Sequence, residues 1–72
     1  MPAIENLAVV ALLVDLPAEK LIRGQVGTIV EVLSPEKMLV EFSDESGRTY
    51  GLPTLNSRDL MVLHHHPAHQ LA

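Results

Sequence analysis

The sequence predicts an all-β fold, a small antiparallel barrel of five short strands followed by a tail. Three observations support this. Hydrophobic residues make up 47% of the 72 residues, which is too large a share for a disordered chain. Short apolar or alternating segments rich in β-branched residues are separated by turn residues. Closure into a barrel also removes the sheet edges that so short a β chain has few other means to protect.

The first apolar segment, residues 7–14, reads as a strand or a short helix, because periodicity does not separate the two in a continuous apolar run. The turn signal at residues 15–17 and the small length favour a strand. Such a strand carries apolar side chains on both faces. A monomer buries only one face in its core, so one of two sets of side chains is left exposed to water. The two sets are Leu7, Val9, Ala11 and Leu13, and Ala8, Val10, Leu12 and Val14.

A polar loop with one helical turn is expected at residues 17–23, with Leu21 and Ile22 packing back onto the fold. The next strand runs to residue 33, and its two glycines, Gly24 and Gly27, suit a positive φ or a close backbone approach. Period-two alternation then divides the strand into two faces. One face carries Val26, Thr28, Val30 and Val32, and the other Ile29, Glu31 and Leu33.

The remaining strands follow at short intervals. A turn at residues 34–37 leads into a strand over residues 38–42, with Met38, Val40 and Phe42 directed inward and Glu41 outward. A second polar turn precedes a short strand over residues 48–52, which pairs back on residues 38–42 and is ended by Pro53. A tight 3₁₀ turn at residues 56–59 precedes the closing strand, residues 60–63. The barrel therefore occupies residues 1–63, and residues 64–72 form a disordered, histidine-containing tail.

The segment LIRGQVGTIVEV, residues 21–32, resembles the KOW-type turn and strand of SH3-like barrels. Together with the residues from Val40 to Leu63, it resembles a family of small standalone bacterial proteins that is classed only as a domain of unknown function. The resemblance implies an SH3-like barrel and carries no reaction, cofactor or catalytic residue. Some members of the family are encoded beside toxin-like or uncharacterised proteins, which implies a partner-binding role.

Composition excludes several classes of protein. The chain has no cysteine, so a disulfide scaffold, a classical zinc module and a thiol enzyme are excluded. The net charge is −4, and the five basic residues are scattered among nine acidic ones, which disfavours nucleic-acid binding. The eight-residue apolar run is too short to span a bilayer, and no basic segment precedes it as in a secretory signal. We expect a cytoplasmic protein.

Candidate chemical sites are few. His64, His65, His66 and His69 are potential metal ligands, but adjacent residues on a tail lack preorganised geometry, and a disordered tail is the favoured interpretation. Asp44 and Glu45 are a potential acid/base pair, which a solvated turn explains equally well. No serine lies in a nucleophile elbow. We therefore expect no enzyme activity, no catalytic or metal site and no cofactor.

The predicted function is binding of another protein, including further copies of the chain itself, so a homo-oligomer is expected. The candidate contact residues are Arg48, Tyr50, Phe42, Val9 and Ala11. The alternative is a KOW-like module that binds RNA or the ribosome through Arg23, Lys37, Arg48 or Arg58.

Overall fold

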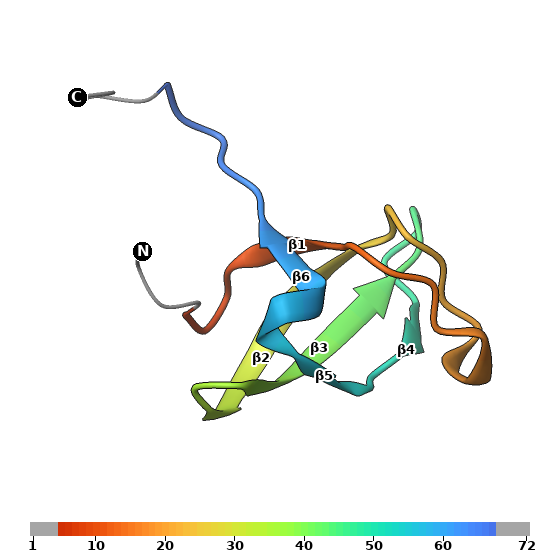
Figure 1. Ribbon diagram of the computed structural model, residues 1–72. Coiled ribbons are helices and arrows are strands. Elements are labelled where there is room, and N and C mark those ends of the chain that lie inside the picture. The colour runs from red at the N-terminus through yellow and green to blue at the C-terminus, as the bar shows by residue number, and fades with distance from the viewer. Residues whose placement is uncertain (1–4, 68–72) are drawn as a thin grey trace.

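The computed structural model describes residues 5–67, and all regular structure within them is β-strand or 3₁₀ helix. The all-β prediction is therefore confirmed (Figure 1). No helix in this part of the chain is long and apolar enough to cross a membrane. The elements in chain order are β1 (Val9–Leu12), η1 (Pro17–Glu19), β2 (Val26–Ser34), β3 (Lys37–Ser43), β4 (Thr49–Gly51), β5 (Thr54–Asn56), η2 (Ser57–Asp59) and β6 (Leu60–Val62).

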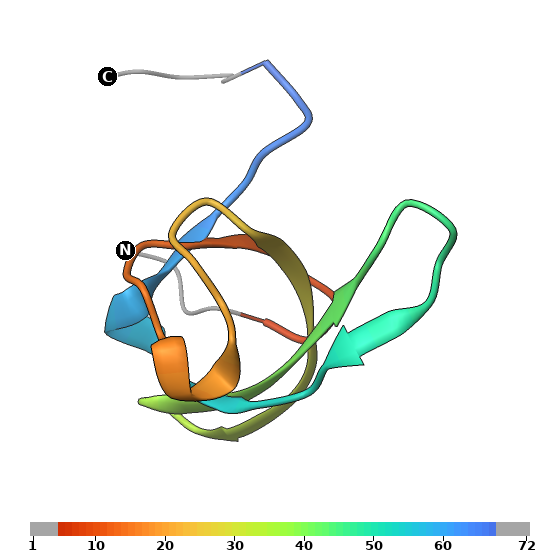
Figure 2. The same cartoon turned by 90° about the vertical axis from the view of Figure 1, so that its right-hand side faces the viewer.

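The strands form one antiparallel sheet in the order β4-β3-β2-β1-β6, with β5 also paired to β3. The sheet curls around a common core, which is visible when the molecule is viewed end-on (Figure 2). Within residues 5–67 no strand pairing closes the sheet between β6 and β4 or β5. The sheet thus has six strands rather than the predicted five and is open. The extra strand arises because the chain resumes pairing with β3 after Pro53, whose carbonyl accepts a hydrogen bond from the Val40 amide (3.0 Å).

Strand β1 is shorter than predicted. Leu7 has a φ of 67°, a left-handed conformation that ends the extended segment on the N-terminal side. Val10 and Leu12 are 0% and 1% exposed and belong to the core. Of the set expected to be exposed to water, Leu7 and Leu13 are exposed, but Val9 is half-buried and Ala11 is only 8% exposed, so the expectation was wrong for Ala11. Each face of β1 therefore has a different environment.

Strands β2 and β3 form a hairpin, and the inward direction of Met38, Val40 and Phe42 is confirmed. The predicted alternation of β2 holds only for its first half, in which Gly27 and Ile29 are buried. Register shifts between Ile29 and Glu31 and between Val32 and Ser34 interrupt the pairing. Residues 30–33 are all exposed, so the predicted division into two faces does not hold in this half of the strand.

The core is a single cluster with residues from every strand except β4 and from the loop before β2. In that loop Leu21 is buried, whereas Ile22 is 62% exposed, so the prediction that both pack back was wrong for Ile22. Gly24 has a φ of +96°, which confirms the positive φ expected there. The cluster consists of Val10, Leu12, Leu21, Ile29, Met38, Val40, Phe42, Leu55 and Leu60.

Candidate protein-binding surface

The outward face of β1 continues into its two neighbouring strands. In the register of the sheet, Ala11 lies opposite Met61 of β6 on one side and opposite Val26 of β2 on the other. Directly opposed residues in an antiparallel pair project to the same face, so these three apolar side chains form a row on the outside of the sheet. Val9 and Leu13 flank Ala11 on that face, because side chains alternate along a strand. We call the surface made by Val9, Ala11, Leu13, Val26 and Met61 the outer apolar face.

The members of the outer apolar face differ in exposure. Val26 and Met61 are about half exposed (48% and 49%), and Leu13 is 38% exposed. Ala11, between them, is only 8% exposed, and Val9 is half-buried. The centre of the row is thus buried, whereas Val26, Met61 and Leu13 remain open to solvent. An apolar patch of this kind is typical of a surface that contacts another protein.

A groove of about 960 Å³ runs beside β6 and shares Leu13 and Met61 with the outer apolar face. Its walls come from β6 and η2 on one side and from the β2–β3 hairpin on the other. Most of its lining residues are apolar. The remaining lining residues are Glu5, Ala8, Val32, Ser34, Pro35, Met38, Ser57, Arg58, Leu60, Val62 and His64.

The residues predicted to contact a partner do not form one patch. Phe42 is fully buried in the core, so its side chain offers no surface to a partner, which corrects the prediction for this residue. Its ring lies 6.3 Å from that of Tyr50, which is 48% exposed and covers the core from outside. Arg48 is exposed in the loop before β4. Val9 and Ala11 belong to the outer apolar face.

Asp44 organises the acidic turn between β3 and β4, which comprises residues 44–48. Its Oδ1 accepts hydrogen bonds from the Ser46 hydroxyl (2.7 Å), the Ser46 amide (2.9 Å) and the Arg48 amide (3.0 Å). The hydrogen bond from the Ser46 hydroxyl, followed by that from Arg48, lowers the pKa of the Asp44 carboxyl. Gly47 has a φ of +87°, which completes the turn. A carboxylate held ionised in this way stabilises a turn and is poorly suited to act as a general base.

The histidines that can be placed are exposed. His64, His65 and His66 follow β6 without regular structure, and His69 lies outside the described residues, as do the last residues of the predicted tail. Among residues 5–67, no three histidine or acidic side chains are close enough together to hold a metal ion.

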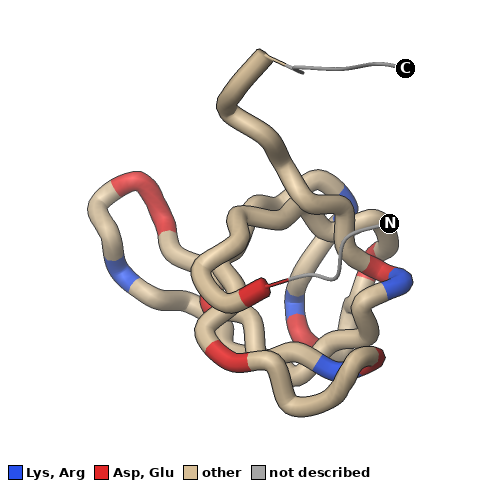
Figure 3. The backbone as a smooth tube through the Cα atoms, turned by 90° about the vertical axis from the view of Figure 1, so that its left-hand side faces the viewer, with Lys and Arg blue, Asp and Glu red and all other residues tan. Residues whose placement is uncertain are grey.

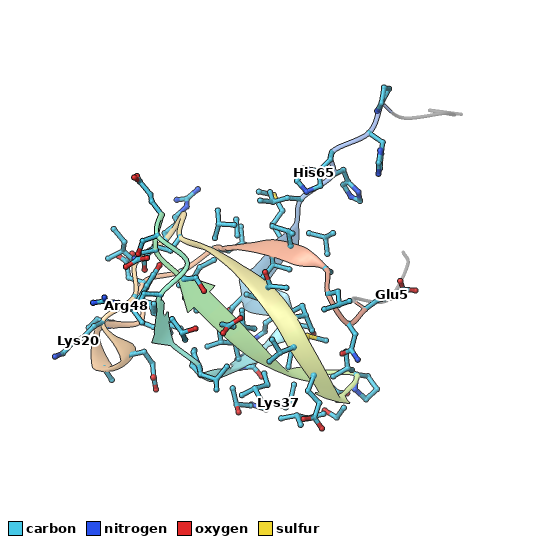
Figure 4. All side chains as sticks on the ribbon, turned by 180° about the vertical axis from the view of Figure 1, so that it is seen from behind. Glu5, Lys20, Lys37, Arg48 and His65 are labelled. Atoms are coloured by element: carbon cyan, nitrogen blue, oxygen red, sulfur yellow. The ribbon has the colours of Figure 1, made fainter. Side chains whose placement is uncertain are left out.

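The basic residues named for RNA binding lie on four separate segments. Arg23 precedes β2, Lys37 begins β3, Arg48 precedes β4 and Arg58 lies in η2. Acidic residues are interspersed with them over the surface (Figure 3). Lys37 lies at the hairpin end of the molecule and Arg48 at the end that carries Lys20 (Figure 4). A stripe of positive charge, the usual electrostatic footprint of a nucleic-acid binder, is not formed by these residues.

Sequence reasoning missed Val26 and Met61 as surface partners of Ala11. Both were placed in strands, but only the register of β1 with β2 and β6 shows that they share a face with Ala11. The groove was missed entirely, since it is formed by segments far apart in the chain.

A protein-family model described as a domain of unknown function (DUF4926) matches residues 6–62. No curated protein and no solved structure matches the chain significantly.

Proposed function

The chain belongs to the DUF4926 family, a domain of unknown function, and from that premise we propose that it is a non-catalytic binding module that contacts another protein through the outer apolar face. The partner is a second protein or a further copy of the chain. A product encoded nearby is a candidate, as the resemblance to small bacterial proteins with toxin-like neighbours implies.

The observation that carries the proposal is the two-sided apolar character of β1. Val10 and Leu12 fill the core from one face, and on the other face the half-exposed side chains of Val26 and Met61 flank the buried Ala11, with Leu13 partly exposed beside them. Burial of the exposed parts of this row against a partner contributes on the order of several kcal/mol, at about 25 cal/mol per Å² of apolar area, before the costs of association. The same area left exposed has no stabilising role in a monomer.

The architecture supports an SH3-like barrel with a KOW-like strand as the finer description of the fold. Strand β1 pairs with both β2 and β6, the β4 and β5 segments both pair with β3, and a 3₁₀ turn precedes the last strand. In the KOW-like segment, Gly24 has the positive φ and Gly27 the close backbone approach for which the two glycines were expected. Barrels of this size serve many unrelated functions, so the function is argued from the surface.

The test uses the whole chain and a Val26→Lys variant, which places a charge on the outer apolar face outside the core and outside the groove. Sedimentation velocity of the wild-type chain over nanomolar to micromolar concentrations measures self-association. Purified products of neighbouring genes are then titrated against both chains by calorimetry. We expect either self-association or binding of one such product, weakened at least about tenfold by the substitution. A monomer that binds none of these proteins, or binding that is unchanged in the variant, contradicts the proposal.

A further inference from the structure

Strand β6 is the last strand of the sheet, and one of its edges has no partner strand within residues 5–67. The amide of Leu63 donates to the Val9 carbonyl (2.9 Å), and the amide of Leu13 donates to the Asp59 carbonyl (2.8 Å). Residues 59, 61 and 63 therefore direct their backbone groups toward β1, and Leu60 and Val62 direct theirs to the free edge. The Leu60 amide is taken up by the Ser57 carbonyl in η2. Among residues 5–67, the amide and carbonyl of Val62 and the carbonyl of Leu60 have no backbone partner, which leaves them for a further strand.

The groove lies along this free edge. Leu60, Met61 and Val62 line one side of it and Val32 and Met38 of the hairpin line the other, with a volume of about 960 Å³ between them. That volume is at the upper end of the range for ligand sites. An extended chain fits the features of the groove better than a helix, because a helix has no free backbone groups along its length to pair with those of Val62.

The two ends of the groove carry opposite charges. Arg58 precedes β6 and lines the groove at the Leu60 end. Glu5 precedes β1, which runs antiparallel to β6, so it lines the groove beyond the Val62 end. A strand added antiparallel to β6 has its N-terminus near Glu5 and its C-terminus near Arg58. Charge complementarity therefore favours a basic residue at the N-terminal end of the segment and an acidic residue at its C-terminal end.

We propose that the free edge of β6 and the adjoining groove bind an extended segment of a partner protein, which adds to the sheet as an antiparallel strand with alternating aliphatic side chains, a basic N-terminal flank and an acidic C-terminal flank. The partner is a different protein rather than a second copy, since the groove is concave and the strands described in this chain are all held within its own sheet. This inference goes beyond the proposed function, because it concerns a second surface that shares only Leu13 and Met61 with the outer apolar face.

The experiment titrates ¹⁵N-labelled chain with the capped heptapeptide KVTVTVD, which has the required alternation and flanks. Two control peptides accompany it: the charge-swapped DVTVTVK, and KVTVTVD with N-methylated backbone amides. We expect saturable shifts of the amide signals of Val62 and Val32, binding of the charge-swapped peptide weaker by about tenfold, and no binding of the methylated peptide.

Two substitutions locate the binding in the protein. Val62→Pro removes the amide that faces the free edge without removing a hydrogen bond to β1, and it abolishes binding, whereas Val62→Thr keeps the amide and retains binding. Val32→Lys places a charge in the groove away from β6, and we expect it to weaken binding. This second variant keeps the test decisive if Val62→Pro does not fold.

The inference is overturned if no peptide gives saturable shifts, if the methylated and unmodified peptides bind alike, or if the shifts fall outside the groove. Each of these results leaves the proposed function to be decided by Val26→Lys, because Val26 lies on the outer apolar face and does not line the groove. Conversely, a partner that loses affinity with Val26→Lys and keeps it with Val32→Lys binds at the outer apolar face alone.

Discussion

Gly27 packs directly against Val40: a Cβ atom on Gly27 would lie 2.8 Å from Cγ1 of Val40 and 2.9 Å from the Glu41 carbonyl oxygen. The second of these is a backbone atom in the middle of β3, so it does not move aside easily. We expect Gly27→Ala to destabilise the fold by about 1–3 kcal/mol through overpacking, measured by urea denaturation.

The matched control is Gly51→Ala. A Cβ atom at Gly51 has no contact closer than 3.8 Å, and the residue also lies in a strand next to β3. We expect this variant to remain within about 0.5 kcal/mol of the wild type. Equal destabilisation by both substitutions would show that the close approach of β2 to β3 is not the cause.

Asp44 holds the loop between β3 and β4, and this loop should respond to acid. Because the hydrogen bonds from Ser46 and Arg48 lower the pKa of Asp44 in the folded state, the ionised form stabilises the loop fully above the ordinary carboxyl value of 3.8. That stabilisation is lost as the pH falls through the lower folded-state pKa. We expect the Ser46 and Arg48 amides to lose their protection against exchange, relative to unstructured amides at the same pH, below that range, as measured by NMR.

Asp44→Asn removes the pH dependence by removing the titrating group. The amides of Ser46 and Arg48 should then exchange at a rate that changes with pH only as unstructured amides do. The same acid response in the variant as in the wild type would assign the effect to another group.

The neighbouring residues Leu12 and Leu13 test the two faces of β1. Leu12 is 1% exposed and Leu13 is 38% exposed, although both are leucines in one apolar run. We expect Leu12→Ala to cost about 2–5 kcal/mol in the free energy of unfolding and Leu13→Ala less than about 1 kcal/mol, measured by denaturation of the monomer. A large cost at both positions would mean that Leu13 is also part of the monomer's core.

The parts of the fold that depend on local pattern were predictable from the sequence. The inward residues Met38, Val40 and Phe42 follow from simple alternation, and the positive φ of Gly24 follows from its place at the end of a loop. The bulge after Ile29 was not predictable, because alternation continues in the sequence through the point where the pairing shifts. Strand β5 was missed for a related reason: Pro53 reads as the end of a strand, yet pairing with β3 resumes after it.

The candidate surface was predictable only in part. The apolar outer side of β1 follows from the sequence, since no single face can hold eight consecutive apolar residues. Its extension to Val26 and Met61 depends on the register between strands far apart in the chain. The patch of Arg48, Tyr50 and Phe42 was wrong for Phe42, because this residue lies on the inward face of β3 and its ring is fully buried in the core.

Binding to RNA, the alternative prediction, can be decided by charge. Affinity for nucleic acid comes mainly from clustered basic residues that neutralise phosphates, and it falls steeply with salt. The basic residues Arg23, Lys37, Arg48 and Arg58 are all exposed but lie on separate segments among acidic residues, and the net charge is −4.

We expect no shift of a structured or single-stranded RNA in gels run at low salt with micromolar chain. The control is Glu41→Lys, which adds a positive charge on β3 and should leave the result unchanged. A salt-sensitive shift that is lost in the double variant Lys37→Ala, Arg48→Ala would instead favour the RNA-binding role and count against a surface that acts only through its apolar face.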